Sequence, residues 1–371
     1  MATDPDVLSS RLETFADRLS AMGAIRSPAI AAAFATIRRD RCVESFFGPD
    51  GLVVVPQDVI PQPGILDLVY ADAPLVTRLN AATGTPRSSS SQPSLVARML
   101  DALQLTRGLA VLEVGAGTGY NAALIATVTG APVVTVDADE DTAELARSSI
   151  DRLGLSHLVT VVVADGFEGH GPAAPYDRLI VTCGCNGLSP QWLDQLAGGG
   201  LAVVPLAHGG MHPIVAVTKS QRSASGQAVM SADFMFASGR LSSGRSPMLA
   251  DVSLSDTFTR HPDLAPMLDW DAYTTLWFYL AARNHRITRL RSDVDGIDLS
   301  LGTCTMHDAG IGTAIVQMDG SISATGDRSI LRSVARLIES WDAHGRPPLT
   351  AWTCAFSEPA PVHVPVGWQL N

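Results

Sequence analysis

Basic residues are a minority in this chain: 26 Lys and Arg stand against 37 Asp and Glu, for a formal net charge of −11. Nucleic-acid binding relies on basic side chains that displace counterions from phosphates, so we expect no nucleic-acid partner. The chain also lacks a run of about eighteen apolar residues, and its N-terminus has neither the basic segment nor the apolar core of an export signal. We therefore expect no membrane association and a cytoplasmic protein.

Cysteine is scarce as well. The five cysteines are scattered, and only Cys183 and Cys185 lie close together. Their spacing has no matching second pair and no nearby histidines, so the sequence predicts buried thiols and no metal site. A composition of 46% hydrophobic and 17% charged residues is typical of a globular protein with a sizeable core, and 371 residues suggest two or three domains.

The most informative segment is Val111–Ala126, an apolar run that leads through three glycines into a second apolar run. This pattern predicts a strand, a tight turn and a helix. Glycines at 115, 117 and 119 allow positive φ and a close approach of the backbone to a ligand at a helix N-terminus. Their spacing is G-x-G-x-G, whereas the pyrophosphate-binding fingerprint is G-x-G-x-x-G. Together with Glu113, this spacing favours S-adenosylmethionine over NAD.

Two further acids follow predicted strands. Val133–Asp137 is β-branched and ends in Asp137, which we expect to accept hydrogen bonds from the ribose hydroxyls. Val159–Ala164 leads into Asp165 and Gly166, where the carboxylate can accept from the adenine amino group. Ligands of open α/β sheets bind along the carboxyl edge of the strands, so the three positions form one predicted cofactor site. Taken singly, each acid could equally be a helix N-cap or a solvated carboxylate.

Strands and helices alternate up to about residue 205, which predicts an α/β fold with a doubly wound, mostly parallel sheet. Runs at 214–218 and 230–236 predict a terminal antiparallel hairpin. The Ser-, Gly- and Pro-rich stretch 240–256 is the predicted boundary, which gives a first domain over 1–245 and a smaller α+β domain over 246–371. In that second domain we expect helices at Trp270–Ala281 and Ser329–Trp341, strands at 311–317, 350–356 and 362–370, and tryptophans that belong to the core.

Two helices are expected between about 8 and 47, with a break at Ser27-Pro28. The proline-containing stretch 48–87 shows little periodicity and is predicted to be a long irregular loop. Ser88 and Ser89 are predicted to be linker. A helix follows Pro93, with Ser91 available as its N-cap.

The segment Ser91-Gln92-Pro93, joined to the glycine turn, resembles the protein-L-isoaspartate (D-aspartate) O-methyltransferase family, whose members carry Ser-x-Pro before the corresponding helix. The region from Ile37 to Phe46 and the blocks at 164–166, 176–182 and 196–205 are also similar to that family. The resemblance covers roughly residues 8–240. It implies a class I S-adenosylmethionine-dependent methyltransferase fold and O-methylation of a carboxylate.

By this resemblance, Ser91 lies beside the transferred methyl group and binds the substrate carboxylate or the cofactor. Thr182, at the end of a strand, is expected to face the same cleft, and the following Cys183–Gly187 turn departs from the family's small-residue turn. One of His208 and His212 is a candidate for peptide contact, but the favoured interpretation is that they are ordinary surface histidines. A catalytic triad is not expected, because a carboxylate nucleophile is already ionised near neutral pH.

Two departures from the family affect the function inferred. The loop over 48–87 and the domain after 245 are both unlike compact repair enzymes. They resemble methyltransferases associated with ribosomally made modified peptides, which esterify an ordinary aspartate in a macrocyclic or folded peptide and drive it to succinimide or isoaspartate. The alternatives are an isoaspartyl repair enzyme with an appended domain, a small-molecule methyltransferase, and a cofactor- or peptide-binding scaffold without catalysis.

Overall fold

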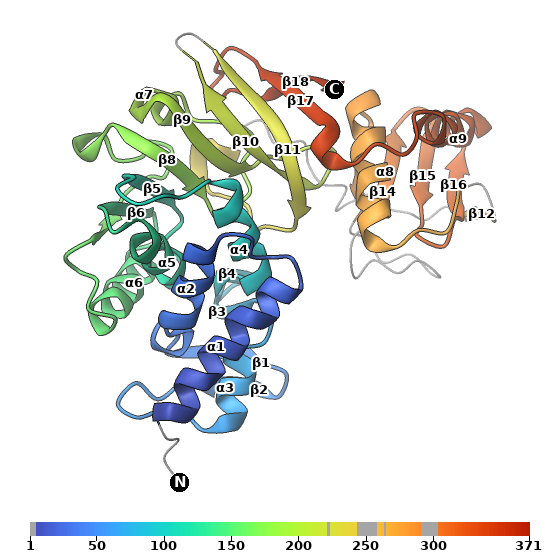
Figure 1. The fold of residues 1–371 in the computed structure, drawn as a ribbon. Coiled ribbons are helices and arrows are strands. Elements are labelled where there is room, and N and C mark those ends of the chain that lie inside the picture. Colours follow the sequence, from blue (N-terminus) through green and yellow to red (C-terminus); the bar gives the residue numbers. More distant parts are fainter. Residues whose placement is uncertain (1–4, 221–222, 243–257, 263–264, 291–302) are drawn as a thin grey trace.

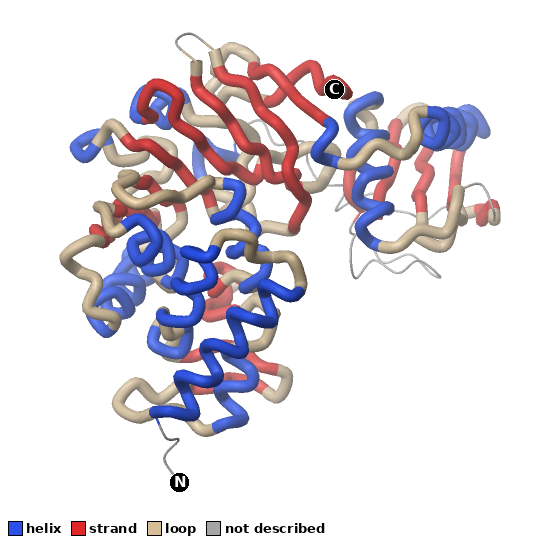
Figure 2. The backbone as a smooth tube through the Cα atoms, in the orientation of Figure 1, coloured by secondary structure: helices blue, strands red, loops and turns tan. Residues whose placement is uncertain are grey.

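The computed structural model describes residues 5–220, 223–242, 258–262, 265–290 and 303–371. Its centre is a nine-stranded sheet with the order β18-β17-β11-β10-β9-β8-β5-β6-β7 (Figure 1). Figure 2 shows this sheet between helices on one side and mostly loops on the other. Within the described residues, none of the helices combines the length and apolarity needed to cross a bilayer.

The parallel half of the sheet consists of β5 (Val111–Val114), β6 (Val133–Asp137), β7 (Val159–Val163), β8 (Tyr176–Val181) and β9 (Leu196–Pro205). All adjacent pairs among them are parallel. From β5 the strand order runs in opposite directions, to β6 and β7 on one side and to β8 and β9 on the other. The carboxyl end of β5 is therefore the switch point, where open α/β sheets bind ligands.

Side chains alternate between the two faces of the central sheet along each strand, and each face is covered by a different set of elements. Val111 and its neighbours on one face join the core beneath five helices, while Leu112 and its neighbours on the other face pack against a short helix and several loops. The first set is α1 (Pro5–Ala21), α2 (Pro28–Thr36), α4 (Pro93–Ala102), α5 (Tyr120–Thr129) and α6 (Glu140–Arg152), and the short helix is α7 (Pro190–Gln195). The predicted α/β architecture with a doubly wound, mostly parallel sheet is confirmed.

The antiparallel half extends further than the sequence predicts. Strands β10 (His212–Lys219) and β11 (Ala224–Ala232) form the expected hairpin, but the second strand begins six residues earlier than the predicted 230–236. The hairpin does not end the sheet, because β17 (Trp352–Phe356) pairs with β11 and β18 (Pro365–Leu370) pairs with β17. The last residues of the chain thus belong to the central sheet.

The stretch 48–87 is not the irregular loop predicted from its prolines. It contains two hairpins and a helix, with β1 and β2 forming the first hairpin and β3 and β4 the second. Ser88 and Ser89 lie in β4 and are not linker. The elements are β1 (Ser45–Gly48), β2 (Gly51–Val54), α3 (Pro63–Val69), β3 (Leu75–Leu79) and β4 (Pro86–Ser90), preceded by the short helix η1 (Arg39–Arg41).

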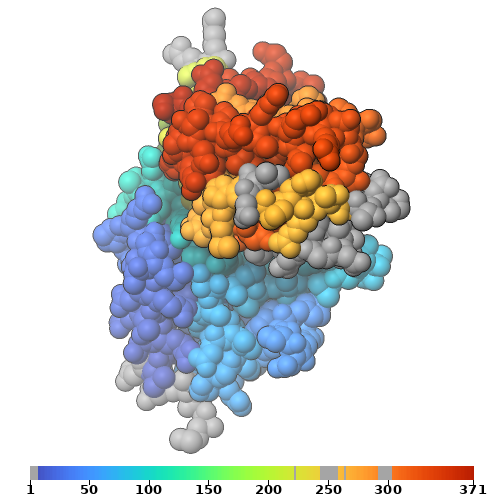
Figure 3. Space-filling model, turned by 90° about the vertical axis from the view of Figure 1, so that its right-hand side faces the viewer, coloured from blue at the N-terminus to red at the C-terminus, as the bar shows by residue number. Residues whose placement is uncertain are grey.

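The C-terminal part forms a second body with a five-stranded antiparallel sheet of order β12-β16-β15-β14-β13. Its elements are β12 (Thr259–His261), α8 (Trp270–Arg283), β13 (Ile287–Leu290), β14 (Thr303–Asp308), β15 (Gly312–Val316), β16 (Ile322–Gly326) and α9 (Arg328–Ala343). Trp277, Trp341 and Trp352 are buried in its core as expected. Figure 3 shows this body, in orange and red, above the blue and cyan N-terminal elements.

The division at residue 245 remains a prediction, and most of the boundary stretch 240–256 lies outside the described residues. Three short helices complete the fold: η2 (Gly171–Ala173), η3 (Gly239–Ser242) and η4 (Leu349–Ala351). The last of these leads the chain from α9 back into β17.

Candidate functional site

The three glycines after β5 adopt the conformations that the motif predicts. Gly115, Gly117 and Gly119 have φ of 100°, 52° and 75°, and Gly119 is the N-cap of α5. A side chain on Gly115 would also collide, because its Cβ would lie 2.3 Å from the Thr182 hydroxyl oxygen. A Cβ on Gly117 would lie 3.2 Å from the Ser89 carbonyl oxygen, which is a tight contact. The turn is therefore closely packed between the end of β8 and strand β4, and its glycine N–H groups donate to Val136 O, Asp137 Oδ2 and Ala116 O.

Glu113 lies inside the protein, behind the turn. Its side chain is fully buried and accepts a hydrogen bond from Asn121 Nδ2 at 2.6 Å. Burial raises the pKa of this carboxyl to about 7, against the opposing effect of hydrogen bonds from Thr135 and Asn121. In this arrangement Glu113 links β5 to α5 and has no exposed surface for a ligand.

Asp137, at the end of β6, lies at the edge of the turn. Its Oδ2 accepts a hydrogen bond from Gly117 N at 3.3 Å and its Oδ1 accepts one from Asp139 N at 3.0 Å. Burial raises the pKa of Asp137, and these backbone hydrogen bonds oppose the shift. The carboxylate thus has a fixed orientation beside the glycine turn, where hydroxyl groups of a nucleoside would find an acceptor.

Asp165 and Gly166 follow the adjacent strand β7. Asp165 is exposed; it accepts from Phe167 N at 2.9 Å and forms an ion pair with Arg240 at 3.0 Å. A Cβ on Gly166 would lie 2.6 Å from Val114, so this residue packs directly against the end of β5. Arg240 also lies over the Phe167 ring, 3.9 Å from its centroid, and was not found by sequence reasoning.

Thr182 lies on the opposite side of the turn from Asp137, directly after β8. Its hydroxyl hydrogen bonds to the carbonyl oxygens of Val114, at 3.1 Å, and Gly115, at 2.8 Å. These contacts hold the start of the glycine turn against β8. The hydroxyl proton is therefore engaged by the turn itself.

Ser91 is half-buried and precedes α4, but it is not the N-cap of that helix. The N-cap is Gln92, which makes no side-chain capping hydrogen bond. Instead, Asp72 accepts from Ser94 N at 2.8 Å and from Gln92 Nε2 at 3.0 Å. Since Asp72 satisfies the helix terminus, the Ser91 side chain is not needed as a cap and is available for another partner.

Arg39 organises the segment before Ser91, and sequence reasoning missed it. Its guanidinium is fully buried and donates to carbonyl oxygens that lie more than 29 residues away in the chain. Burial lowers its pKa to about 10. The acceptors are the carbonyl oxygens of Val69, Ala71, Ala73, Ser90 and Ser91, together with the Ser90 hydroxyl. Only the three-dimensional arrangement reveals this role, because the local sequence shows Arg39 as one of three arginines around Asp40.

The two histidines after β9 are not surface residues. His212 is buried beside Phe236, with ring centroids 4.5 Å apart. His208 contacts Phe278 and Trp368 of the C-terminal part, with centroids 4.9 Å and 5.3 Å away. Both positions therefore join packed elements.

The Cys183–Gly187 turn connects this region to Thr182. Cys185 pairs with Leu206 at the end of β9, and Gly184 pairs with Phe236. Gly184 has no room for a side chain, since a Cβ there would lie 2.4 Å from the His212 ring. The turn thus fixes how Thr182 is joined to the segment after β9.

A family profile described as protein-L-isoaspartate (D-aspartate) O-methyltransferase matches residues 10–242. Protein-L-isoaspartate O-methyltransferases of Methanopyrus kandleri and Koribacter versatilis are each 33% identical to the chain. The first aligns over 223 residues, 60% of this chain and 88% of the relative, and the second over 221 residues, 59% and 87%.

A solved structure titled protein-L-isoaspartate O-methyltransferase aligns with a TM-score of 0.56 and 24% identity, over 95% of this chain and 98% of its own. At 24% sequence identity this similarity shows the fold. Because the alignment covers 95% of this chain, the similarity in fold continues beyond residue 242. The family match alone spans more than half of the chain, including the stretch 48–87. The chain therefore belongs to the protein-L-isoaspartate (D-aspartate) O-methyltransferase family and is an S-adenosylmethionine-dependent carboxyl O-methyltransferase.

Proposed function

We propose that S-adenosylmethionine binds at the carboxyl ends of β5, β6 and β7. The glycine turn at 115–119 lies beside Asp137, which would accept from the ribose hydroxyls, and Asp165 with Gly166 would receive the adenine. The lack of space for a Cβ at Gly115, the positive φ of Gly117 and the fixed Asp137 carboxylate support this assignment. Glu113 and Thr182 would act as positioning residues, since both are engaged in holding the turn.

The sulfonium of the cofactor supplies an electrophilic methyl group. The acceptor carboxylate is ionised near neutral pH, so the protein need not remove a proton. What the chain supplies is alignment and partial exclusion of water. Ser91 is the proposed catalytic contact, because its segment is fixed by Arg39 while its hydroxyl makes no hydrogen bond within the described residues.

For the acceptor, we propose the side-chain carboxylate of an aspartate in a ribosomally made, modified peptide that is macrocyclic or folded. The resulting methyl ester would be attacked by the next backbone nitrogen, with loss of methanol and closure of an aspartimide. Water would open this ring to aspartate or isoaspartate. The observation that supports a dedicated peptide is the packing of the C-terminal part on the methyltransferase sheet. Trp277 Nε1 donates to Gly209 O, in the loop after β9, at 2.8 Å, and Arg289 pairs with Asp233, directly after β11, at 2.7 Å.

A second candidate is methylation of isoaspartyl residues in damaged proteins. The names of the curated relatives favour it, and so does the solved structure whose fold matches this chain over 95% of its length. That match means that an extension beyond the hairpin is not confined to enzymes of modified peptides. An irregular loop over 48–87 would be one reason to expect an enzyme other than a repair enzyme. Residues 45–54 and 75–90 form ordered hairpins, so this reason does not apply.

Paired peptides distinguish the two acceptors. The full chain is incubated with labelled donor and with linear peptides that differ only in aspartate or isoaspartate, beside macrocyclic precursors encoded near its gene. A gain of about fourteen daltons on an aspartate of a precursor, followed by loss of methanol, supports the primary proposal. Efficient methylation of the generic isoaspartyl peptide, with none on the precursors, would favour repair instead.

Ser91→Ala tests the catalytic contact. We expect kcat/KM for the acceptor to fall by roughly 10- to 100-fold, since one hydrogen bond to a charged group is lost, with little change in donor affinity. Steady-state kinetics and calorimetry measure the two quantities. Ser223→Ala, in the loop between β10 and β11, is the matched control, because its hydroxyl hydrogen bonds to Ser220 and to no other of the described residues. Unchanged kcat/KM in Ser91→Ala would remove Ser91 from the site.

A further inference from the structure

The β3–β4 hairpin lies against the glycine turn. The Ser89 carbonyl oxygen would lie 3.2 Å from a Cβ on Gly117, so the two backbones are in direct contact at this point. Within the hairpin, Thr77 Oγ1 lies 3.2 Å from Ser88 Oγ. The hairpin thus forms one border of the proposed nucleoside site.

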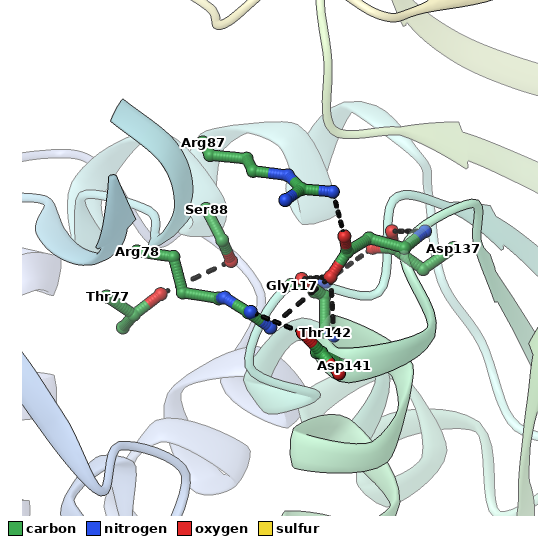
Figure 4. A network of polar contacts seen from close by, with 9 residues as sticks. Thr77, Arg78, Arg87, Ser88, Gly117, Asp137, Asp141 and Thr142 are labelled. Carbon is green, nitrogen blue, oxygen red and sulfur yellow. Dashed lines mark hydrogen bonds and ion pairs between the residues drawn. The ribbon is translucent and has the colours of Figure 1, made fainter. Parts of the chain in front are cut away.

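Two arginines connect this hairpin to the start of α6 (Figure 4). Arg78 of β3 lies 3.3 Å from Asp139 Oδ1 and 2.5 Å from Asp141 Oδ2. Arg87 of β4 forms an ion pair with the other oxygen of Asp139. One carboxylate therefore receives a guanidinium from each strand of the hairpin, and we call these three residues the Arg78–Asp139–Arg87 cluster.

The cluster lies two residues beyond the proposed ribose acceptor. Asp139 N donates to Asp137, so the backbone that carries the cluster also orients the Asp137 carboxylate. Asp139 is also the N-cap of α6 and accepts from Thr142 N at 2.8 Å. Its side chain is only 19% exposed, so screening by salt weakens these ion pairs less than it would a fully exposed pair.

The hairpin is held differently at its two ends. Near its base, Arg39 binds the Ser90 and Ser91 carbonyls from the buried side. Near its turn, Arg78 and Arg87 are partly exposed and bind acids of a different element. The base thus depends on buried hydrogen bonds, while the turn end depends on ion pairs that can open without exposing the core.

We propose that Arg78 and Arg87 are positioning residues for methyl transfer, which hold the β3–β4 hairpin closed beside the bound nucleoside through their shared carboxylate, Asp139. Release of the nucleoside product then requires these ion pairs to separate. This inference rests on the donor site proposed above. It assigns a role to three residues that the family motifs do not include.

The experiment measures dissociation of S-adenosylhomocysteine from the full chain by stopped-flow displacement. Arg78→Gln, Arg87→Gln and Asp139→Asn each remove one charge, and asparagine remains a good N-cap, so α6 keeps its start. We expect each variant to release the nucleoside roughly fivefold faster. Raising NaCl should accelerate release from the wild-type chain more than from Asp139→Asn, which keeps the Arg78–Asp141 ion pair. Arg147→Gln is the matched control, because Arg147 pairs with Glu144 on the same helix and does not reach the hairpin.

A double-mutant cycle separates positioning from general stability. If the cluster acts as a unit, Arg87→Gln with Asp139→Asn releases the nucleoside about as fast as Asp139→Asn alone, and Arg87→Lys restores most of the wild-type rate. Release rates of all variants equal to the wild type would overturn the inference while leaving the donor site intact. Failure of the wild-type chain to bind S-adenosylhomocysteine would overturn the donor site itself, and this inference with it.

Discussion

At the scale of single residues, the buried Glu113 links the glycine turn to the pH dependence of stability. Its pKa is raised by burial to about 7, so the folded chain binds a proton that the unfolded chain has released between about pH 4.5 and 7. The protonated Glu113 therefore leaves the folded state fully stable below about pH 4.5, and this stability is lost as the pH rises from there through 7. The lost contribution is on the order of 3 kcal/mol.

Glu113→Gln tests this. Glutamine keeps an acceptor for Asn121 Nδ2 and carries no charge. We expect a higher Tm than the wild type at pH 8 and a similar Tm at pH 5, measured by thermal unfolding in both buffers. Asp151→Asn, on the exposed side of α6, should leave the pH profile unchanged. An equal effect of Glu113→Gln at both pH values would contradict the raised pKa.

Residues of the site could be predicted from sequence where their spacing is local. The glycines at 115–119 and the acids that end β6 and follow β7 are defined by short motifs, and the structure places them along one sheet edge. Arg39 could not be found in this way, because its hydrogen bonds join segments 30 to 52 residues away. The buried position of Glu113 also depends on which way a strand residue points, which its motif does not state.

At the scale of elements, the N-terminal hairpins show why composition misled the prediction for 48–87. Prolines and serines there suggested a loop, yet Ser88 and Ser90 are buried in β4. Their hydroxyls are satisfied by Thr77 and Arg39, so polar residues occupy a strand at little cost. Such compensation comes from distant side chains and leaves no periodic signal.

Arg39→Lys tests how far this element depends on one guanidinium. A lysine ammonium has three donors and no planar fork, so several of the carbonyls bound by Arg39 would lose their partner. We expect the free energy of unfolding to fall by roughly 2–4 kcal/mol, as measured by urea denaturation. Arg26→Lys, at an exposed position, serves as control. A change below about 0.5 kcal/mol would mean that the hairpin base does not need this residue.

At the scale of the whole molecule, His208 joins the two bodies. Its Nε2 is buried without a hydrogen-bond partner in the described part of the chain, and burial lowers its pKa to about 4. Protonation therefore favours the unfolded state, and stability present above pH 6.5 is lost as pH falls toward 4. The contribution is on the order of 3 kcal/mol.

His208→Phe should retain the ring contacts with Phe278 and Trp368 and remove the titration. We expect the Tm of this variant to change less between pH 7 and pH 4.5 than that of the wild type, as measured by scanning calorimetry. His157→Gln, at an exposed position, should retain the wild-type acid sensitivity. A variant as acid-sensitive as the wild type would show that other groups control the acid transition.

The return of the chain to the central sheet determines how the protein can be dissected. Because β17 and β18 pair onto β11, a stop codon after residue 245 would strip two strands and leave β11 as an open edge prone to intermolecular pairing. The second body is an insertion in the chain between β11 and β17, two strands that pair with each other in the central sheet. Excising it internally, with a short glycine-serine splice from the end of η3 to the start of η4, is thus the better route to a minimal catalytic core.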